Sequence, residues 1–120
     1  MIKANELRIG NLVHNALNAV VKVEAIGYNI INPGAEFSPE MKYLKGIPLT
    51  PEILEKAGFT YRYLSPKQHY FENGMVSINT YKTKDSFYYE SQLCDVSIDY
   101  VHQLQNLYYA LCGSELTINI

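Results

Sequence analysis

Residues 59–90, FTYRYLSPKQHYFENGMVSINTYKTKDSFYYE, are the part of the chain that decides the fold. The stretch holds four short runs rich in aromatic and β-branched residues, and these runs alternate between apolar and polar positions. Turn-forming residues separate them at Ser65-Pro66, at Asn73-Gly74 and at Thr83-Lys84-Asp85. Alternation of this kind predicts half-buried strands, and Asn-Gly is the strongest short hairpin signal. We therefore predict an antiparallel meander from Phe59 to Tyr89.

The segment before this meander is also predicted to be extended and rich in turns. Gly10-Asn11 suits a turn with positive φ, after which Leu12-Val13 starts an extended segment. Residues 19–26 (AVVKVEAI) place small or branched apolar residues on one face, so they predict a strand that ends at Gly27. A second strand is predicted over residues 28–31, before the Asn-Pro-Gly turn that follows it.

A short helix is predicted directly before the meander. Thr50 can cap it, Pro51 occupies its first position, and Gly58 ends it. Two helical turns are too few to be stable alone, so this helix must pack against the sheet.

A longer helix is predicted over residues 98–112, with Ser97 or Asp95 as its cap and Gly113 at its end. Its apolar stripe is expected to contribute most to the core. The stripe consists of Val101, Leu104, Leu107, Tyr108, Leu111 and Cys112. Residues 116–120 alternate again and predict a final strand.

Together these elements predict an α+β fold, in which a twisted antiparallel sheet is packed by one long C-terminal helix and one short helix. The chain has 120 residues, of which 48% are hydrophobic and 18% charged, which excludes a disordered or low-complexity protein. No linker, repeat or charge block is visible. We predict that residues 1–120 form a single globular domain.

Composition also excludes several classes of protein. A formal net charge of -2 argues against binding nucleic acid by bulk charge, and no apolar run is long enough to span a bilayer. The N-terminus lacks the apolar region of a signal peptide, so we expect a cytoplasmic protein with no membrane contact. Its two cysteines, Cys94 and Cys112, are then expected to be thiols, with Cys112 buried as a small apolar residue.

Three stretches, taken in order, resemble a family of small proteins encoded by gut anaerobes, their phages and mobile elements. They are ELRIGNLV at 6–13, IPLTPEIL at 47–54 and YVHQLQNLYYAL at 100–111, and the last is the most specific. No activity is assigned to that family, so the resemblance implies a shared fold and a mobile-element context but no catalytic residue. Residues 10–13 with the following valine-rich segment also resemble the first hairpins of SH3-like barrels, a pattern that many folds share.

The sequence contains no motif of a known catalytic or metal site. The three histidines lie far apart, and metal-ligand spacings, phosphate-binding loops and nucleophile elbows are all missing. Cys94, Asp95, Asp99 and His102 could in principle form a nucleophilic set. The simpler interpretation is that the two aspartates favour a helix start while His102 is exposed. We therefore expect no catalytic residue, no bound metal, no cofactor and no enzymatic activity.

Tyrosine is unusually frequent, with 11 among 15 aromatic residues and no tryptophan. Two interpretations stay open: the rings pack across strands, or they form a recognition surface on the sheet. In the second case single-stranded nucleic acid could stack on the rings. The residues predicted to contact it are Arg62, Lys67, Lys82, Lys84, Tyr61 and Tyr81. Residues 59–90 carry four bases and three acids, which is weak for binding phosphates.

The long helix lacks formal charge from Tyr100 to Gly113, although solvent-facing helices usually carry several charges. Either a segment of the same chain covers its polar face or another chain does. A surface poor in charge and rich in tyrosine is typical of interface cores. We predict that His102, Gln105, Asn106 and Tyr109 contact a protein partner, which could be a second copy of the chain. Replacing Gln105 and Asn106 by Glu should then disturb assembly but not folding.

The sequence thus predicts a non-enzymatic interaction module that serves as an adaptor or accessory protein of a bacterial or phage system. The alternative is a nucleic-acid-binding accessory protein that uses the tyrosine- and lysine-bearing sheet.

Overall fold

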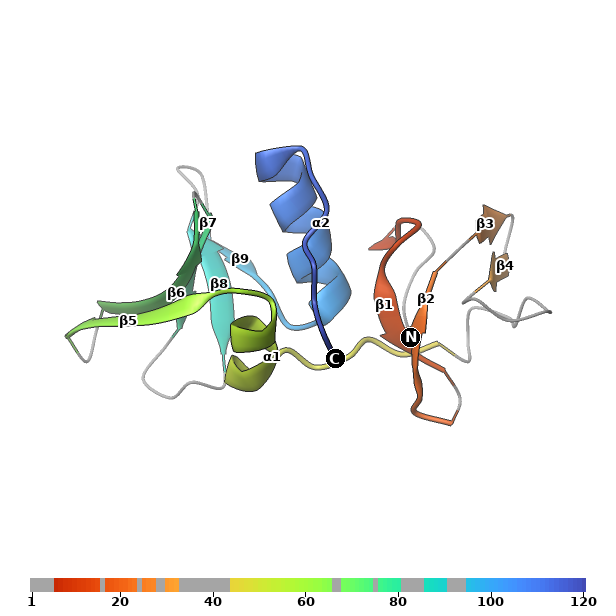
Figure 1. Ribbon diagram of the computed structural model, residues 1–120, viewed down its shortest axis with the longest axis horizontal. Coiled ribbons are helices and arrows are strands. Elements are labelled where there is room, and N and C mark those ends of the chain that lie inside the picture. Colours follow the sequence, from red (N-terminus) through yellow and green to blue (C-terminus); the bar gives the residue numbers. More distant parts are fainter. Residues whose placement is uncertain are drawn as a thin grey trace. The chain divides into compact units, whose positions relative to one another are not determined.

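The computed structural model describes residues 6–15, 17–23, 25–27, 30–32, 44–65, 68–74, 76–80, 86–90 and 95–120. Over these residues the chain forms nine strands and two helices (Figure 1), and the predicted α+β class is confirmed. The chain forms two compact units. Unit 1 is Met1–Pro48 with Tyr100–Asn106, and unit 2 is Leu49–Asp99 with Leu107–Ile120. A single domain over residues 1–120 stays a prediction.

Unit 1 is built on two antiparallel hairpins. In the first, β1 (Leu12–His14) pairs with β2 (Val20–Lys22), and in the second, β3 (Ala25–Gly27) pairs with β4 (Ile30–Asn32). The predicted strand over residues 19–26 is therefore divided between two hairpins.

The predicted turn at Gly10 is confirmed, because its φ of 99° lies in the left-handed region that glycine adopts without steric cost. Gly10 N–H then donates to the Val23 carbonyl, and Val23 N–H donates to the Asn11 carbonyl. These two bonds extend the pairing of the first hairpin beyond its strands.

The core of unit 1 is small and apolar. Leu7, Val13, Val23 and Leu44 form one buried cluster, and Val21 packs against it. Val20 is 43% exposed, so valines alternate between solvent and core as the sequence predicts. Lys45 adds to the edge of β1 through two backbone hydrogen bonds of 2.9 Å with His14.

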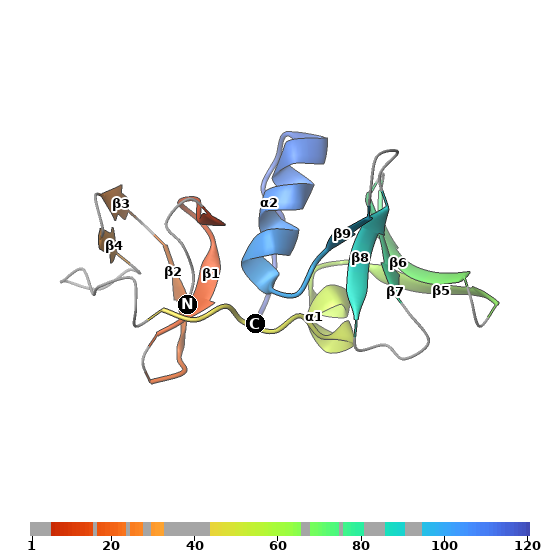
Figure 2. The ribbon, with the colours of Figure 1, turned by 180° about the vertical axis from the view of Figure 1, so that it is seen from behind.

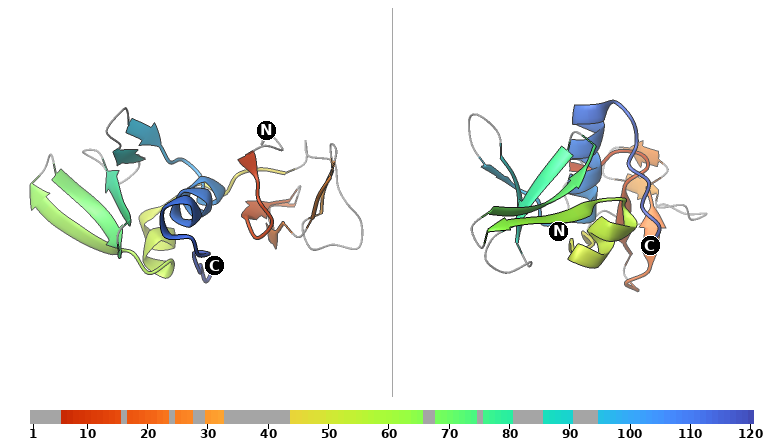
Figure 3. Two further views of the ribbon diagram at one scale, coloured as in Figure 1. Left: turned by 90° about the horizontal axis from the view of Figure 1, so that it is seen from above. Right: turned by 60° about the vertical axis from the view of Figure 1, so that its left-hand side comes forward.

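Unit 2 contains a five-stranded antiparallel sheet in which neighbours in sequence are neighbours in space (Figure 2). Its strands are β5 (Thr60–Ser65), β6 (Gln68–Asn73), β7 (Val76–Thr80), β8 (Phe87–Glu90) and β9 (Asp95–Ser97). The predicted meander is confirmed from β5 to β8, with Gly74 at a φ of 61° in the β6–β7 hairpin. The sheet is twisted, so that its strands cross one another at an angle in the right-hand view of Figure 3.

One face of this sheet, here called the inner face, carries the core of unit 2. Val76, Ile78 and Thr80 are buried along β7, while Ser77 and Asn79 between them are half-buried. This pattern confirms the predicted alternation of β7. The other buried apolar side chains of unit 2 include Phe59, Phe71, Phe87 and Ile98.

The short helix α1 (Pro51–Lys56) agrees with its prediction at both ends. The Thr50 hydroxyl accepts a 3.2 Å hydrogen bond from Ile53 N–H, and Gly58 follows the helix with a φ of 87°. Leu54 is completely buried, and α1 contacts β5. Asn73 Nδ2 also donates to the Ala57 carbonyl at 3.1 Å, which joins the end of α1 to the β6–β7 hairpin.

The long helix α2 (Val101–Cys112) starts later than predicted. Residues 95–97 form β9 instead of a helix cap, because Asp95 and Val96 pair with Glu90 and Tyr89 of β8. The cap is built at Tyr100, whose N–H donates to Gln103 Oε1 at 3.1 Å, as the N3 side chain does in a capping box. Gly113 ends the helix with a φ of 71°, as predicted.

The apolar stripe of α2 is buried only in part. Val101 and Leu104 are inaccessible, but Leu111 is 44% exposed and Cys112 is an exposed free thiol. The prediction of a buried Cys112 is therefore wrong. The buried positions of α2 are confined to its first half, so the last turn contributes little to a core.

The predicted C-terminal strand is not formed, because residues 115–120 have no regular secondary structure. Leu116 is nevertheless buried and Ile118 is half-buried, so the apolar alternation serves side-chain packing without strand pairing. Within the described residues, neither helix is long and apolar enough to cross a membrane.

Candidate functional site

Two places in the structure concentrate polar groups, and the first is the polar face of α2 in unit 1. Gln105 is only 3% exposed. Its Oε1 accepts from Leu12 N–H at 2.8 Å, and its Nε2 donates to the Gly10 carbonyl at 3.2 Å. One side chain thus pairs with two partly buried backbone groups, one in the turn before β1 and one at its first residue.

Asn106, the next residue of α2, binds residues that lie nearer to the N-terminus of the chain. Its Oδ1 accepts from Arg8 Nε and from Asn11 Nδ2, both at 2.9 Å, and its Nδ2 donates to the Glu6 carbonyl at 2.7 Å. Asn11 is itself completely buried, and its Oδ1 accepts from Arg8 N–H. The two amides of α2 and the segment 6–12 therefore form one connected hydrogen-bond network.

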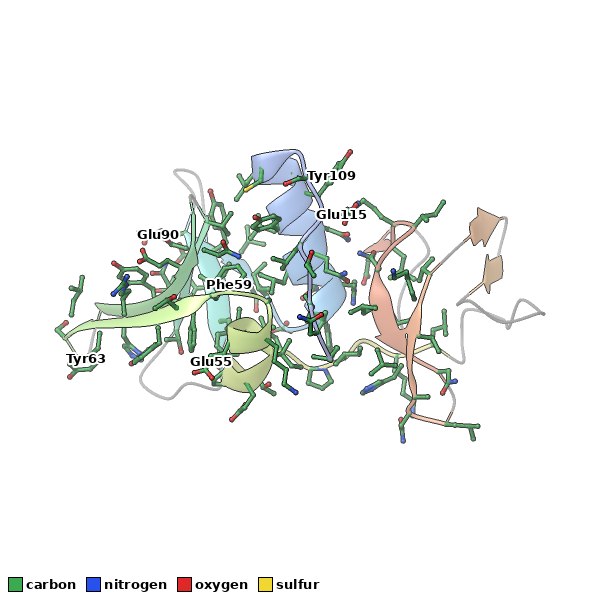
Figure 4. The ribbon with its side chains drawn as sticks, in the orientation of Figure 1. Glu55, Phe59, Tyr63, Glu90, Tyr109 and Glu115 are labelled. Atoms are coloured by element: carbon green, nitrogen blue, oxygen red, sulfur yellow. The ribbon has the colours of Figure 1, made fainter. Side chains whose placement is uncertain are left out.

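These contacts correct the predicted partner site on α2. Of the two alternatives left open by the sequence, a segment of the same chain covers Gln105, and His102 is buried as well, whereas Asn106 is half-buried and its contact with a partner stays a prediction. The reason is that the backbone of residues 6–12 offers the donors and acceptors that the two amides need. Tyr109 is 44% exposed, and its contact with a partner stays a prediction (Figure 4).

His102 lies beside this network and is not exposed, contrary to the prediction. Its ring is completely buried and stacks on Tyr100, with centroids 5.8 Å apart and an interplanar angle of 11°. Gly46 lies against both stacked rings, since a Cβ there would be 2.7 Å from the Tyr100 ring and 3.2 Å from His102 Cε1. Any larger residue at position 46 would displace one of these rings.

The electrostatic environment of His102 is dominated by burial. Neither ring nitrogen forms a hydrogen bond. The carboxylate oxygen Oε2 of Glu6 lies 3.5 Å from Nε2, which is too far for a well-formed hydrogen bond. Burial lowers the pKa of His102 below its ordinary value of 6.5, and the Glu6 carboxylate opposes this shift. Burial thus favours the neutral form of the imidazole over its charged form.

The nucleophilic set considered in the sequence is not assembled by the described residues. Cys94 lies outside them, Asp95 is on β9, and the Asp99 carboxylate accepts from the Ser97 hydroxyl at 2.9 Å. The part of the chain that the structure describes also holds no group of three or more His, Cys, Asp or Glu that could bind a metal. The absence of catalytic activity stays a prediction.

The second place where polar groups gather is the five-stranded sheet of unit 2. The tyrosines of this sheet are divided between its two faces. Tyr61 lies on the inner face, where its ring centroid is 5.0 Å from that of Phe71 and its hydroxyl is 3.0 Å from His69 Nδ1. Tyr61 therefore packs across strands, which was one of the two interpretations left open. Tyr63, towards the end of β5, is 61% exposed (Figure 4).

The opposite face, here called the outer face, carries a row of paired residues that crosses all five strands. Arg62 pairs with Tyr70, Tyr70 with Asn79, Asn79 with Tyr88, and Tyr88 with Ser97. Directly paired residues project to the same side of a sheet, so these five side chains form one continuous band. We call this band the outer row. Each of its members is exposed or half-buried.

Next to the outer row lies a hollow of about 290 Å³, lined by Tyr70, Ser77, Asn79, Tyr89 and Glu90. Short side chains on β7 stand between larger ones on β6 and β8, which opens space above the middle of the sheet. Glu90, at the end of β8, is exposed (Figure 4). It pairs directly with Asp95 of β9, so two carboxylates face each other across neighbouring strands.

Charge on the outer face is uneven. Arg62 Nε donates to Glu72 Oε1 at 2.7 Å, and this carboxylate raises the pKa of Arg62 above its ordinary value. Arg62 is the sole base among the described residues of the five strands, and it is engaged by an acid. Glu90 and Asp95 have no salt bridge to a base in the described part of the sheet.

The predicted nucleic-acid contacts are thus not gathered on one described surface. Arg62 lies on the outer face and Tyr61 on the inner face. The remaining four, Lys67, Lys82, Lys84 and Tyr81, lie outside the described residues. Sequence reasoning did not find Tyr70, Asn79 and Tyr88 as a group, since their alignment depends on the register of two hairpins, β6–β7 and β7–β8. The tyrosine excess was the one signal that pointed towards this face.

Comparison of the chain with protein families, with curated proteins and with solved structures finds no match.

Proposed function

We propose that the protein is a non-enzymatic interaction module that binds a protein partner through the outer face of the unit 2 sheet. The observation that carries this proposal is the outer row, a band of Arg, Tyr, Asn, Tyr and Ser side chains that runs without interruption over five strands. Tyrosine and arginine are enriched among the residues that dominate binding energy in interfaces. Their rigid backbone support keeps the entropic cost of binding low.

The chemistry of this face also supports a protein partner. The hollow of about 290 Å³ lies near the lower limit of roughly 300–1,000 Å³ for small-molecule pockets, so it suits one side chain of a larger partner. The role of adaptor or accessory protein in a bacterial or phage system is proposed from the sequence resemblance.

The test is affinity capture from a lysate of the native host, with the tagged full chain as bait. We expect Tyr70→Ala to lose a partner that the wild-type chain retains, because Tyr70 belongs both to the outer row and to the hollow. Tyr63→Ala is the matched control, since it removes an exposed tyrosine of the same sheet that lies outside the outer row. Equal capture by the wild type and by Tyr70→Ala would contradict the proposal.

Nucleic-acid binding is the second candidate, and the position of Arg62 beside Tyr70 on the outer face favours it. The engagement of Arg62 by Glu72 and the acids Glu90 and Asp95 argue against it, because phosphates need several free bases. Nuclease treatment of the lysate separates the two candidates. Loss of the captured partners after this treatment, with binding of single-stranded DNA that weakens steeply with salt, would favour the second candidate.

A further inference from the structure

We infer that the hollow on the outer face receives a cationic side chain of the partner, an arginine in preference to a lysine. This inference rests on the proposed function and specifies the chemistry that the partner must present. It follows from three features of the hollow: the aromatic ring of Tyr70 in its wall, the carboxylate at its edge, and the charge imbalance of the strands around it.

The wall of the hollow suits a guanidinium group. Tyr70, a member of the outer row, contributes aromatic surface, and cations are attracted to the faces of such rings. Asn79 and Ser77 contribute polar groups that can accept hydrogen bonds. A guanidinium group is planar, stacks on aromatic rings and presents several donors at once, whereas an ammonium group is a compact, strongly hydrated charge.

The carboxylates next to the hollow provide the complementary charge. Glu90 lines the hollow, and Asp95 is its direct partner on β9. Like charges directly opposite each other destabilise a sheet. Both side chains are exposed, and the nearest base in the outer row, Arg62, is bonded to Glu72. A cation in the hollow would therefore relieve a repulsion that the described strands leave uncompensated.

The same features of the hollow make a phosphate group or an apolar side chain a less favourable ligand. A phosphate would meet the repulsion of Glu90 and Asp95. An apolar side chain would leave the polar groups of Asn79, Ser77 and Glu90 without partners, which costs free energy when they lose water.

The experiment is a titration of the full-length ¹⁵N-labelled protein with N-acetyl-arginine amide, followed by NMR. We expect saturable shifts of backbone signals at Tyr70, Ser77, Asn79 and Glu90. N-acetyl-citrulline amide is the neutral isostere of the probe and should cause no saturable shift. N-acetyl-lysine amide should bind more weakly than the arginine probe, and equal or tighter binding would contradict the preference for arginine.

Two test variants, each with a matched control, show whether the arginine probe binds in the hollow. Glu90→Gln should weaken the arginine probe about tenfold, because a charge-assisted contact is lost. Glu55→Gln, an exposed glutamate of α1, should leave the affinity unchanged. Tyr70→Leu should also weaken the probe, and Tyr63→Leu should not. The dispersion of the NMR spectrum shows in each case whether the variant is folded.

The outcomes separate this inference from the proposed function. Equal shifts with arginine and citrulline probes, or unchanged affinity in Glu90→Gln, would overturn the inference. If Tyr70→Ala still loses the captured partner in that case, the interaction module stands and only the chemistry of its ligand is wrong. If Tyr70→Ala retains the partner, the proposed function fails whatever the arginine probe does.

Discussion

At the scale of single residues, buried side chains with unpaired polar atoms are uncommon, since most such atoms find a hydrogen-bond partner. His102 is an exception, with both ring nitrogens unpartnered inside unit 1. Three groups surround it: the Tyr100 ring, the backbone of Gly46 and the Glu6 carboxylate. The carboxylate and the face of the Tyr100 ring favour a positive charge on the imidazole, but burial opposes that charge more strongly. His102 therefore links the stability of unit 1 to pH.

The sign of this pH dependence follows from the lowered pKa. In the unfolded chain His102 takes up a proton near pH 6.5, whereas in the folded chain it does so only at lower pH. Below pH 6.5 the unfolded state thus binds more protons than the folded state, and the free energy of unfolding falls. Above pH 6.5 both states are neutral at His102, and its contribution is constant. Once both states are protonated, the free energy of unfolding has fallen by about 1.4 kcal/mol for each pH unit that separates the folded pKa of His102 from its unfolded pKa.

Urea denaturation between pH 4 and pH 8 checks this prediction, with NMR titration of the His102 ring signals to give its pKa. Glu6→Gln removes the group that opposes the shift, so it should lower the pKa of His102 further and increase the loss at acidic pH. A pKa of His102 at or above 6.5 in the folded wild type would contradict the prediction.

At the scale of elements, the first half of α2 makes two kinds of contact, apolar packing and side-chain hydrogen bonds. Val101 and Leu104 provide buried apolar surface, and Gln105 and Asn106 bond the backbone and side chains of the segment 6–12. The helix therefore fixes the segment that precedes β1 by hydrogen bonds of defined direction. A contact of this kind is specific, because each amide satisfies its partners in one orientation only.

Replacing Gln105 by Leu should therefore impair folding. The change leaves the partly buried Leu12 N–H and Gly10 carbonyl without this partner, and each loss lowers the free energy of unfolding by about 1 kcal/mol. Chemical denaturation followed by circular dichroism measures the loss. Ala110→Ser, on the exposed turn of the same helix, is the control and should change stability by less than about 0.5 kcal/mol.

This expectation reverses the one drawn from the sequence, where Gln105→Glu and Asn106→Glu were expected to spare folding. A buried carboxylate at position 105 could not donate to the Gly10 carbonyl and would carry an unpaired charge. Wild-type stability in Gln105→Leu would show that this network contributes nothing to the folded state.

At the scale of the whole molecule, the chain passes from unit 1 into unit 2 and back. Leu49–Asp99 belongs to unit 2, and Tyr100–Asn106 returns to unit 1. α2 then enters unit 2 after Asn106 without a break in the helix. Neither unit is a continuous piece of sequence, so neither can be complete before nearly the whole chain is present.

A single domain over residues 1–120 predicts one cooperative unfolding transition. Differential scanning calorimetry should then give a calorimetric enthalpy equal to the van't Hoff enthalpy. Gln105→Leu, which acts in unit 1, should lower the temperature of that one transition as a whole. Two transitions, of which Gln105→Leu shifts only one, would show that the two units unfold as separate domains.

Much of the fold is predictable from the sequence, because its signals are local. The hydroxyl of Thr50, the glycines at 10, 74 and 113, and the alternation along β7 act within a few residues. Elements without such a signal were missed or misjudged. β9 is three residues long and forms only by pairing with β8. Residues 116–120 fail for the opposite reason, because they carry the alternation of a strand but form none.

The sequence by itself determined the α+β class, the order of the hairpins and both ends of α1, because backbone sterics and side-chain alternation decide these features locally. Tertiary structure alone decided what covers the polar face of α2 and which residues share the outer row. An amide on a helix has the same donors and acceptors whether it meets its own chain or another, so Gln105 looks identical in both cases. The path of residues 6–12 distinguishes the two cases, because it places the backbone of this segment on the polar face of α2.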